Sequence, residues 1–172
     1  AQVQEDTTIN CNSTKSYLVI ANISKRPNLR ALLLTAAAFG CSGVFVVGQP
    51  GFDLDLEGRD LPLPIKEFLQ NGGMFLQRFS KWPEFIDHIR AMRIRLVGVE
   101  IHKDAKTIDQ YFDHVDTAFL MGNEGQGLSD KQMQACDGFV RIPQYGNGTA
   151  SLNVYVAASI VLQRFYQWQI AS

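Results

Sequence analysis

The sequence has few cysteines, little net charge and no long apolar run, and each absence excludes a class of protein. Its 172 residues hold three cysteines, Cys11, Cys41 and Cys136, which lie far apart and form no CxxC pair. An odd number in that arrangement argues against a disulfide framework or a zinc site and favours a reducing compartment. The formal charge of −1 provides no overall basic surplus, so any surface for nucleic acid must be local.

The chain also lacks the segments that direct proteins to membranes or to secretion. The best apolar stretch, residues 31–47, is interrupted by polar residues and glycines, and it falls short of the roughly 20 apolar residues that a membrane helix needs. The polar start has neither the basic head nor the apolar segment of a secretory signal. We therefore expect a soluble, intracellular protein that does not contact a membrane.

Length and composition are those of one globular domain. Hydrophobic residues make up 46% of the chain and charged residues 19%, so neither a disordered nor a fibrous protein is indicated. The first 15 residues are polar, and we expect them to be disordered or to form a linker extension. Residues 16–172 are predicted to form the domain.

Strand and helix patterns alternate along this domain. Short apolar runs predict strands at residues 17–21, 44–47, 74–79, 96–99, 117–121 and 139–142. Helical periodicity and capping residues predict helices at residues 28–39, 65–70, 82–92, 129–135 and 152–168, and residues 48–64 are expected to form a surface loop. Alternation of this kind, with strands that are apolar along their whole length, predicts a parallel α/β sheet. Ligands of such sheets bind beyond the carboxyl ends of the strands.

The richest segment for chemistry is Met-Gly-Asn-Glu-Gly-Gln-Gly-Leu-Ser at residues 121–129. Three glycines within six residues, directly after a strand, allow the backbone to approach a ligand closely. No Gly-Lys-Ser/Thr follows, so this is not a phosphate loop, and the GxxGxG spacing differs from the dinucleotide-binding pattern. A plain tight turn is an alternative interpretation. The carboxylate of Glu124 in a backbone-rich loop at a strand end favours a functional one.

A second polar glycine loop occupies residues 142–153, Ile-Pro-Gln-Tyr-Gly-Asn-Gly-Thr-Ala-Ser-Leu-Asn. It follows a strand, and Ser151 and Asn153 open the final helix. Serine and asparagine commonly cap helix N-termini, so each residue alone is also explained as a cap. The combination of the two loops is harder to explain by structure alone.

In combination the two loops resemble a known family. The segments FLMGNEGQGLSD at residues 119–130, RIPQYGNGTASLNVYVAASIVL at residues 141–162 and, more loosely, NLRALLLTAAAFG at residues 28–40 match the SpoU (TrmH-like) branch of the SPOUT methyltransferases. The resemblance covers nearly the whole chain from Asn22 onward. It implies an α/β domain whose C-terminal segment forms a deep trefoil knot, a feature that periodicity cannot reveal because knots are exceptional.

The resemblance also implies a function. Members bind S-adenosylmethionine in the knot, transfer its methyl group to a ribose 2′-hydroxyl of tRNA or rRNA, and work as homodimers with the active site near the interface. The positions that match the family's cofactor contacts are Glu100, Gly122, Ile142 and Leu152. The positions that match its polar site residues are Asn28, Glu124, Ser151 and Asn153.

One departure from the family pattern bears on catalysis. Members carry an arginine in the first helix where this chain has Leu34. Arg30 lies one helical turn earlier on the same face and is our candidate replacement, with Lys25 and Arg26 as alternatives. One interpretation is therefore an active methyltransferase that uses a substitute cation. The other is a domain that has lost catalysis and serves as an RNA-binding or dimerisation module, and a small-molecule binder is a third.

The histidines do not indicate a metal site. His114 lies near Asp109, Asp113 and Asp116, but no pair of histidines has the i, i+4 spacing of helical ligands, so we expect no bound metal. His88 is expected at the surface of its helix. Apolar residues of the last helix are expected to face a partner subunit, namely Val156, Ile160, Val161, Phe165 and Trp168.

Overall fold

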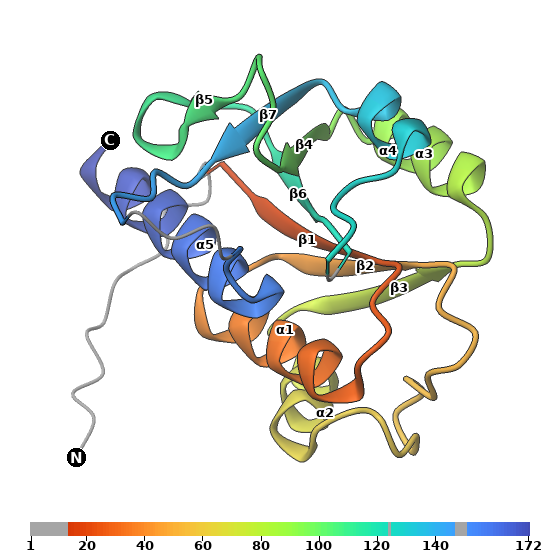
Figure 1. Cartoon of the computed structure of the whole chain (residues 1–172). Helices are drawn as coiled ribbons and strands as arrows, with labels where there is room; N and C mark the ends of the chain where they lie inside the picture. The colour runs from red at the N-terminus through yellow and green to blue at the C-terminus, as the bar shows by residue number, and fades with distance from the viewer. Residues whose placement is uncertain (1–13, 124, 147–150) are drawn as a thin grey trace.

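A seven-stranded, entirely parallel sheet forms the centre of the protein (Figure 1). The computed structural model describes residues 14–123, 125–146 and 151–172. The strand order is β3-β2-β1-β6-β4-β7-β5. This arrangement confirms the parallel α/β sheet that the sequence predicts. The strands are β1 (Ser16–Ala21), β2 (Gly43–Val47), β3 (Phe75–Phe79), β4 (Arg95–Val99), β5 (Lys106–Thr107), β6 (Thr117–Met121) and β7 (Gly138–Arg141).

Helices cover both faces of the sheet and make three layers. One face carries α1 (Arg26–Ala38), α2 (Leu63–Gln70) and α5 (Val154–Ala171), and the other carries α3 (Trp82–Ala91) and α4 (Asp130–Ala135). A short 3-10 helix, Ile108–Gln110, follows β5. Each helix that the sequence predicts is present, with ends displaced by no more than three residues.

The two helical layers enclose two hydrophobic cores, and the interior strand β1 contributes to both. Leu18 and Ile20 face the core under α1, α2 and α5, whereas Tyr17 and Val19 face the core under α3 and α4. Side chains alternate between the faces of a strand, so a strand buried on both sides must be apolar at every position. The carboxyl edge of the sheet is then where polar chemistry can be placed.

Local signals account for several element boundaries. Ser129 caps α4: its hydroxyl accepts a hydrogen bond from the Gln132 backbone at 3.3 Å, while the Gln132 side chain accepts one from the Ser129 backbone at 2.9 Å. This reciprocal pair is a capping box, and it agrees with the prediction from the sequence. Strand β5 was not predicted. Its two residues lack an apolar run and are held in the sheet by pairing with β7.

Residues 48–64 are more deeply packed than the surface loop that the sequence suggested. Phe52 and Leu61 are buried in the core beneath α1 and α2. The carboxylate of Asp60, 3% exposed, accepts hydrogen bonds from the Arg26 Nε at 3.0 Å and from the Asp53 backbone at 2.8 Å. The segment up to Pro62 is a loop, as the sequence predicts, and an ion pair with α1 and apolar anchors hold it against the core.

His88 also differs from expectation. Its imidazole lies against the rings of Phe45 and Phe79, with ring centroids 5.9 and 5.1 Å apart, and its Nε2 is buried without a hydrogen-bond partner among the described residues. The pairing of β3 with β2 brings these two phenylalanines beneath α3. The helical pattern of α3 alone does not contain that information.

Two expectations remain predictions. The predicted extension falls mainly on residues 1–13, which lie outside the described residues, so the boundary at residue 16 stays a prediction. The trefoil knot also stays a prediction. The topology is compatible with it. β7 lies between β4 and β5, and α5, which follows β7 in the chain, packs on α1. Among the described residues, no helix is long and apolar enough to span a bilayer, and no three metal-binding side chains gather.

The buried carboxylate of Asp60 generates a stability prediction. Asp60→Ala leaves the Arg26 guanidinium and the Asp53 N–H without their acceptor, and we expect the free energy of unfolding to fall by about 2 kcal/mol. Urea unfolding followed by circular dichroism measures this change. Asp55→Ala is the matched control, because the Asp55 side chain is 83% exposed and lies 3.8 Å from Arg78. The control should change stability by less than about 0.5 kcal/mol, and equal effects would contradict the role given to Asp60.

Candidate functional site

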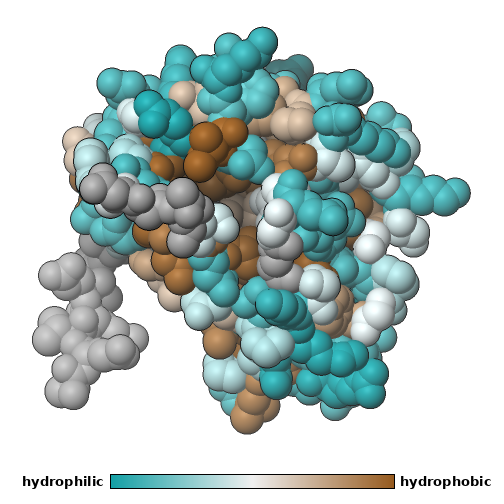
Figure 2. Space-filling model, in the orientation of Figure 1, coloured by the Kyte–Doolittle hydropathy of each residue, from teal (hydrophilic) through white to brown (hydrophobic). Residues whose placement is uncertain are grey.

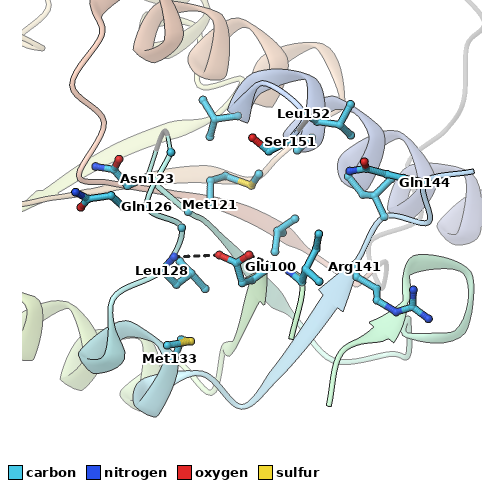
Figure 3. A pocket seen from close by; sticks show the side chains of 18 residues that line it. Glu100, Met121, Asn123, Gln126, Leu128, Met133, Arg141, Gln144, Ser151 and Leu152 are labelled. Carbon is cyan, nitrogen blue, oxygen red and sulfur yellow. Dashed lines mark hydrogen bonds between the residues drawn. The ribbon is translucent and has the colours of Figure 1, made fainter. Parts of the chain in front are cut away.

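A cavity of about 490 Å³ lies at the carboxyl ends of β4, β6 and β7 and extends to the start of α5 (Figure 3). Five residues that the sequence singled out line it together: Glu100, Gly122, Ile142, Ser151 and Leu152. These residues come from four separate segments of the chain. The parallel sheet brings them to one edge, as the placement of ligand sites in such folds predicts.

The glycine-rich segment after β6 forms a closed turn at the cavity wall. The Asn123 backbone donates to the Gly127 carbonyl at 2.9 Å, and the Gly127 backbone donates back to the Asn123 carbonyl at 3.1 Å. Gly125 and Gly127 have φ angles of +89° and +69°, which residues with a side chain rarely adopt. The glycines therefore allow the chain to reverse sharply and return along the cavity.

Two of the glycines are also required by close contacts. A Cβ on Gly122 would lie 3.0 Å from the Gly127 Cα, and a Cβ on Gly127 would collide with the Glu100 carboxylate. The absence of these Cβ atoms brings the backbone against the cavity and against Glu100. The GxxGxG spacing, which does not match a nucleotide-binding loop, therefore allows the turn to pack closely against the end of the strand.

The carboxylate of Glu100 is held in a fixed position inside the cavity. One oxygen accepts a hydrogen bond from the Leu128 backbone at 3.1 Å and the other accepts one from the Ile101 backbone at 2.9 Å. Figure 3 shows Glu100 pointing into the middle of the site, with the bond to Leu128 drawn as a dashed line. An oriented carboxylate can accept hydrogen bonds from ligand hydroxyls or face a positive charge.

The remaining wall is mainly apolar and suits a flat ring system. Met121 and Leu128 are buried, Ile142 is half-buried, and Leu152 is 38% exposed at the mouth. Pockets of roughly 300–1,000 Å³ with an apolar lining and a few fixed polar groups are typical of small-molecule and cofactor sites. This cavity has both properties.

Asn28 and Asn153 are brought together beside the cavity without lining it. The Asn153 Nδ2 lies 3.5 Å from the Asn28 Oδ1, and the Asn153 Oδ1 caps α5 by accepting from the Tyr155 backbone at 3.2 Å. Asn28 is 6% exposed on α1. Both interpretations of Asn153 are thus compatible with the structure: it caps the helix, and it lies at the helix junction next to the cavity.

The cations of the first helix differ in their availability. Arg26 pairs with Asp60 and also donates to the Gly51 carbonyl at 3.2 Å, so it holds the loop before α2. Arg30 has an exposed side chain on α1, and so does Leu34, which is 43% exposed one turn later. Neither lines the cavity at the strand ends. Glu124, which the resemblance places in the site, lies outside the described residues.

The described cysteine thiols do not contribute a nucleophile. Burial raises the pKa of both Cys41 and Cys136 to about 12. Both thiols are therefore protonated at neutral pH, and the thiolate is the reactive form.

Several residues of the cavity were missed in the sequence. Asn123 and Gln126 line it from the glycine turn, and Arg141 and Gln144 line it from the end of β7 and the loop after it. A signal for the first pair was present, because both lie inside the segment that the glycines mark. Arg141 and Gln144 carry no such signal, since their place depends on β7 pairing with β4.

Comparison with known proteins agrees with the site. The model of the SpoU rRNA methylase family matches residues 15–163 of the chain, a range that includes every element from β1 into α5. The chain belongs to this family. The resemblance that rested on the two glycine loops is confirmed.

Two relatives show how much of a SpoU protein the chain represents. The 23S rRNA (guanosine-2′-O-)-methyltransferase RlmB of Acinetobacter baylyi is 30% identical over 152 residues, which cover 88% of this chain and 59% of RlmB. The tRNA (guanosine(18)-2′-O)-methyltransferase TARBP1 of Mus musculus is 27% identical over 159 residues, which cover 92% of this chain and 10% of TARBP1. The chain thus spans about three fifths of one relative and a tenth of the other.

Solved structures show the same architecture. The SpoU methyltransferase AviRb of Streptomyces viridochromogenes superposes with a TM-score of 0.76 at 25% identity, covering 92% of this chain and 61% of AviRb. AviRb in complex with the cofactor AdoMet superposes with a TM-score of 0.72, also at 25% identity, covering 94% of this chain and 62% of AviRb.

Proposed function

We propose that this SpoU domain transfers a methyl group from S-adenosylmethionine to a ribose 2′-hydroxyl of tRNA or rRNA. The observation that carries the proposal is the cavity at the ends of β4, β6 and β7, which unites the four positions that match the family's cofactor contacts. Membership of the SpoU family and the names of its relatives support the reaction. The AdoMet complex of AviRb supports the cofactor.

The residues present fit this cofactor. The volume of about 490 Å³ accommodates a nucleoside, and Ile142 and Leu152 provide apolar contacts for adenine. The turn at Gly122 and Gly127 brings backbone groups to the ligand without a Cβ in the way. Glu100 would supply a fixed acceptor for hydroxyl groups of the cofactor.

When bound, S-adenosylmethionine supplies an electrophilic methyl group on a positively charged sulfur. In the reaction an oxygen–methyl bond forms, the sulfur–methyl bond breaks, and the proton of the 2′-hydroxyl must leave. The chain must hold the hydroxyl oxygen in line with the methyl group, because holding two reactants in the correct geometry lowers the barrier of the reaction. We propose Ser151, at the cavity, and Asn28 and Asn153, beside it, for this positioning, together with Glu124.

Arg30 is our candidate for the cation that assists proton removal and binds the adjoining phosphate. It lies two residues after Asn28 on α1, and it is exposed. Arg26 is a weaker candidate because it is engaged by Asp60. The RNA itself is expected to bind through local contacts, since the chain has no overall positive charge.

We further propose that the domain works as a homodimer through α1 and α5. On the side of α5 that faces away from the sheet, Val156 and Ile160 are half-buried, whereas Arg164 and Gln167 are exposed. Leu34, Tyr166 and Ile170 are exposed. A hollow of about 530 Å³ at this face is lined by Phe39, Ser159, Ile160, Gln163, Arg164 and Gln167. In Figure 2, hydrophobic residues gather over the region of α5 while hydrophilic residues surround them.

One detail of the expected interface is wrong. Val161 and Phe165, which were expected to face a partner, are 0% and 1% exposed and lie in the core of this chain. The sheet and α1 pack on that side of α5. A partner would therefore contact the other side, where Val156 and Ile160 are half-buried.

The first prediction of this proposal concerns the cofactor. Gly127→Ala places a methyl group against the Glu100 carboxylate, so we expect S-adenosylmethionine to bind at least tenfold more weakly, as measured by isothermal calorimetry. Gly40→Ala is the matched control, because Gly40 also has a φ of +69° but has open space around its Cβ position. The control carries the same backbone strain and should bind the cofactor normally. If folded wild-type protein binds neither S-adenosylmethionine nor S-adenosylhomocysteine, the proposed function is wrong.

The second prediction concerns Arg30. Arg30→Ala should lower methyl transfer about 100-fold, the scale of one acid–base or electrostatic group, while cofactor affinity stays the same. Tritiated methyl transfer into total tRNA and rRNA measures the first effect and calorimetry the second. Arg90→Ala, an exposed arginine on α3 at the opposite face of the sheet, is the control.

Leu34→Arg restores the residue that family members carry and distinguishes the alternatives. Under our proposal it rescues Arg30→Ala. A wild-type protein that is inactive and gains activity only with Leu34→Arg would show instead that the domain has lost catalysis and serves as a binding module. An active wild type that is indifferent to Arg30→Ala would transfer the role to another cation, with Lys25 the next to test.

The third prediction concerns assembly. Sedimentation equilibrium at micromolar concentration should give twice the 19.2 kDa mass of one chain. Ile160→Glu should shift the mass toward the monomer, because it places a charge in the hollow between α1 and α5. The control is Ile101→Glu, which changes a 76% exposed isoleucine that does not line this hollow. A monomeric wild type would remove the dimer from the proposal.

A further inference from the structure

A second cavity, of about 470 Å³, adjoins the one proposed for the cofactor. It lies beyond the carboxyl ends of β1, β2 and β6, at the point where the strand order reverses direction from β1-β2-β3 to β6 and β4. Such a reversal leaves a crevice between neighbouring strand ends, where ligands of parallel sheets bind. The cavity's polar lining consists of Asn22, Ser24, Gln49, Asn123, Gln126 and Ser129.

The turn from Asn123 to Gly127 separates the two cavities and lines both of them. In Figure 3 the side chains of Asn123 and Gln126 lie next to each other, and their amide groups point the same way, away from Glu100. The backbone of the turn therefore faces the first cavity, while its two amide side chains are directed to the other side. A ligand in the second cavity would contact residues that also line the first cavity.

The amides around the second cavity are positioned by hydrogen bonds to the loop after β1. Asn123 donates through Nδ2 to the Asn22 carbonyl at 2.6 Å, which leaves its Oδ1 as an acceptor. Gln49 accepts from the Ile23 backbone at 2.6 Å and donates to the Ile23 carbonyl at 3.2 Å, so it fixes the opposite wall. Gln126 is exposed and makes no hydrogen bond to any of the residues described, so both ends of its amide are available.

The lining that the structure describes suits a ligand with hydrogen-bonding groups. Among the described residues, amides, hydroxyls and apolar groups line the cavity. Carboxamides offer a donor and an acceptor side by side, the pattern that matches the hydrogen-bonding edge of a nucleobase.

We infer that the second cavity binds the base of the nucleotide whose ribose is methylated, with Gln126 and the Asn123 Oδ1 contacting the edge of the base. The inference rests on the proposed function for its RNA substrate. A nucleotide that presents its 2′-hydroxyl to the first cavity carries its base on the same sugar, and the shared wall puts the second cavity within reach. Unpaired bases that can be splayed out are the usual targets of sequence-specific RNA recognition.

The first test does not require catalysis. Side-chain amide resonances of ¹⁵N-labelled protein, assigned with Gln126→Ala, are followed while adenosine, guanosine, cytidine or uridine is added to the millimolar range. Saturating S-adenosylhomocysteine is present to fill the first cavity. We expect at least one nucleoside to shift the Gln126 and Asn123 amide signals, while ribose alone shifts neither and the exposed amide of Gln70 on α2 does not respond.

The second test separates base contact from catalysis. With the RNA that the wild type methylates, Gln126→Ala should raise the KM for RNA about tenfold, the scale of one paired amide–base contact. Because Gln126 also borders the first cavity, kcat and cofactor affinity are measured alongside, and each should change by a smaller factor than the KM. Gln70→Ala, the same change at an exposed glutamine on α2, should alter none of these values. Removing the base of the methylated nucleotide should abolish the difference between Gln126→Ala and wild type.

Three results would overturn the inference. The Gln126 signal does not shift with any nucleoside, S-adenosylhomocysteine displaces the nucleoside completely, or Gln126→Ala weakens cofactor binding and leaves RNA binding unchanged. If one of these results is obtained with an active wild type, the base site is wrong and the proposed function stands. An inactive wild type whose Gln126 amide responds to nucleosides would keep the base site and lose the proposed function.

Discussion

The pair of backbone hydrogen bonds between Asn123 and Gly127 is the constraint on which both cavities depend. They close a turn that stands between the cavity at β4, β6 and β7 and the cavity at β1, β2 and β6. The turn can close because Gly125 and Gly127 adopt positive φ angles, and it can lie against Glu100 because Gly127 has no Cβ. A single local conformation thus provides backbone contacts on one side and amide side chains on the other.

The turn is held in place by the rigid sheet behind it. β6 lies in the middle of the sheet, between β1 and β4, and each of its five residues is buried. A strand that is closely packed on both faces has little freedom to shift. The position of the residue that follows β6 is therefore fixed. The Glu100 carboxylate then connects the end of β4 to the backbone after the turn. Two neighbouring strand ends are joined in this way, and the cavity between them keeps its shape.

Paired charges hold the periphery of the fold. Asp60 engages Arg26 and anchors the loop over α1, and Asp113 accepts two hydrogen bonds from Arg95 at 2.7 and 2.6 Å near the opposite edge of the sheet. The guanidinium of Arg95 holds the pKa of the Asp113 carboxyl below its usual range. The stabilisation from this pair is therefore complete above the unfolded-state pKa of an aspartate and declines as the pH falls through the lowered, folded-state value. Arg26 and Arg95 thus have structural partners, and the role that we propose for Arg30 stays a prediction.

The sequence by itself determined the class of fold, the helices and six of the seven strands, because each of these follows from local periodicity and capping residues. It also marked the two glycine loops, whose residue types restrict backbone conformation locally. The tertiary structure alone decided the contacts between distant segments. These are the pairing of β5 with β7, the contacts of the His88 ring with Phe45 of β2 and Phe79 of β3, and the anchoring of the loop at Asp60. The second cavity belongs to the same group. Asn22, Gln49 and Asn123 are far apart in the chain and meet because three parallel strands end at one edge, a long-range contact that no local pattern encodes.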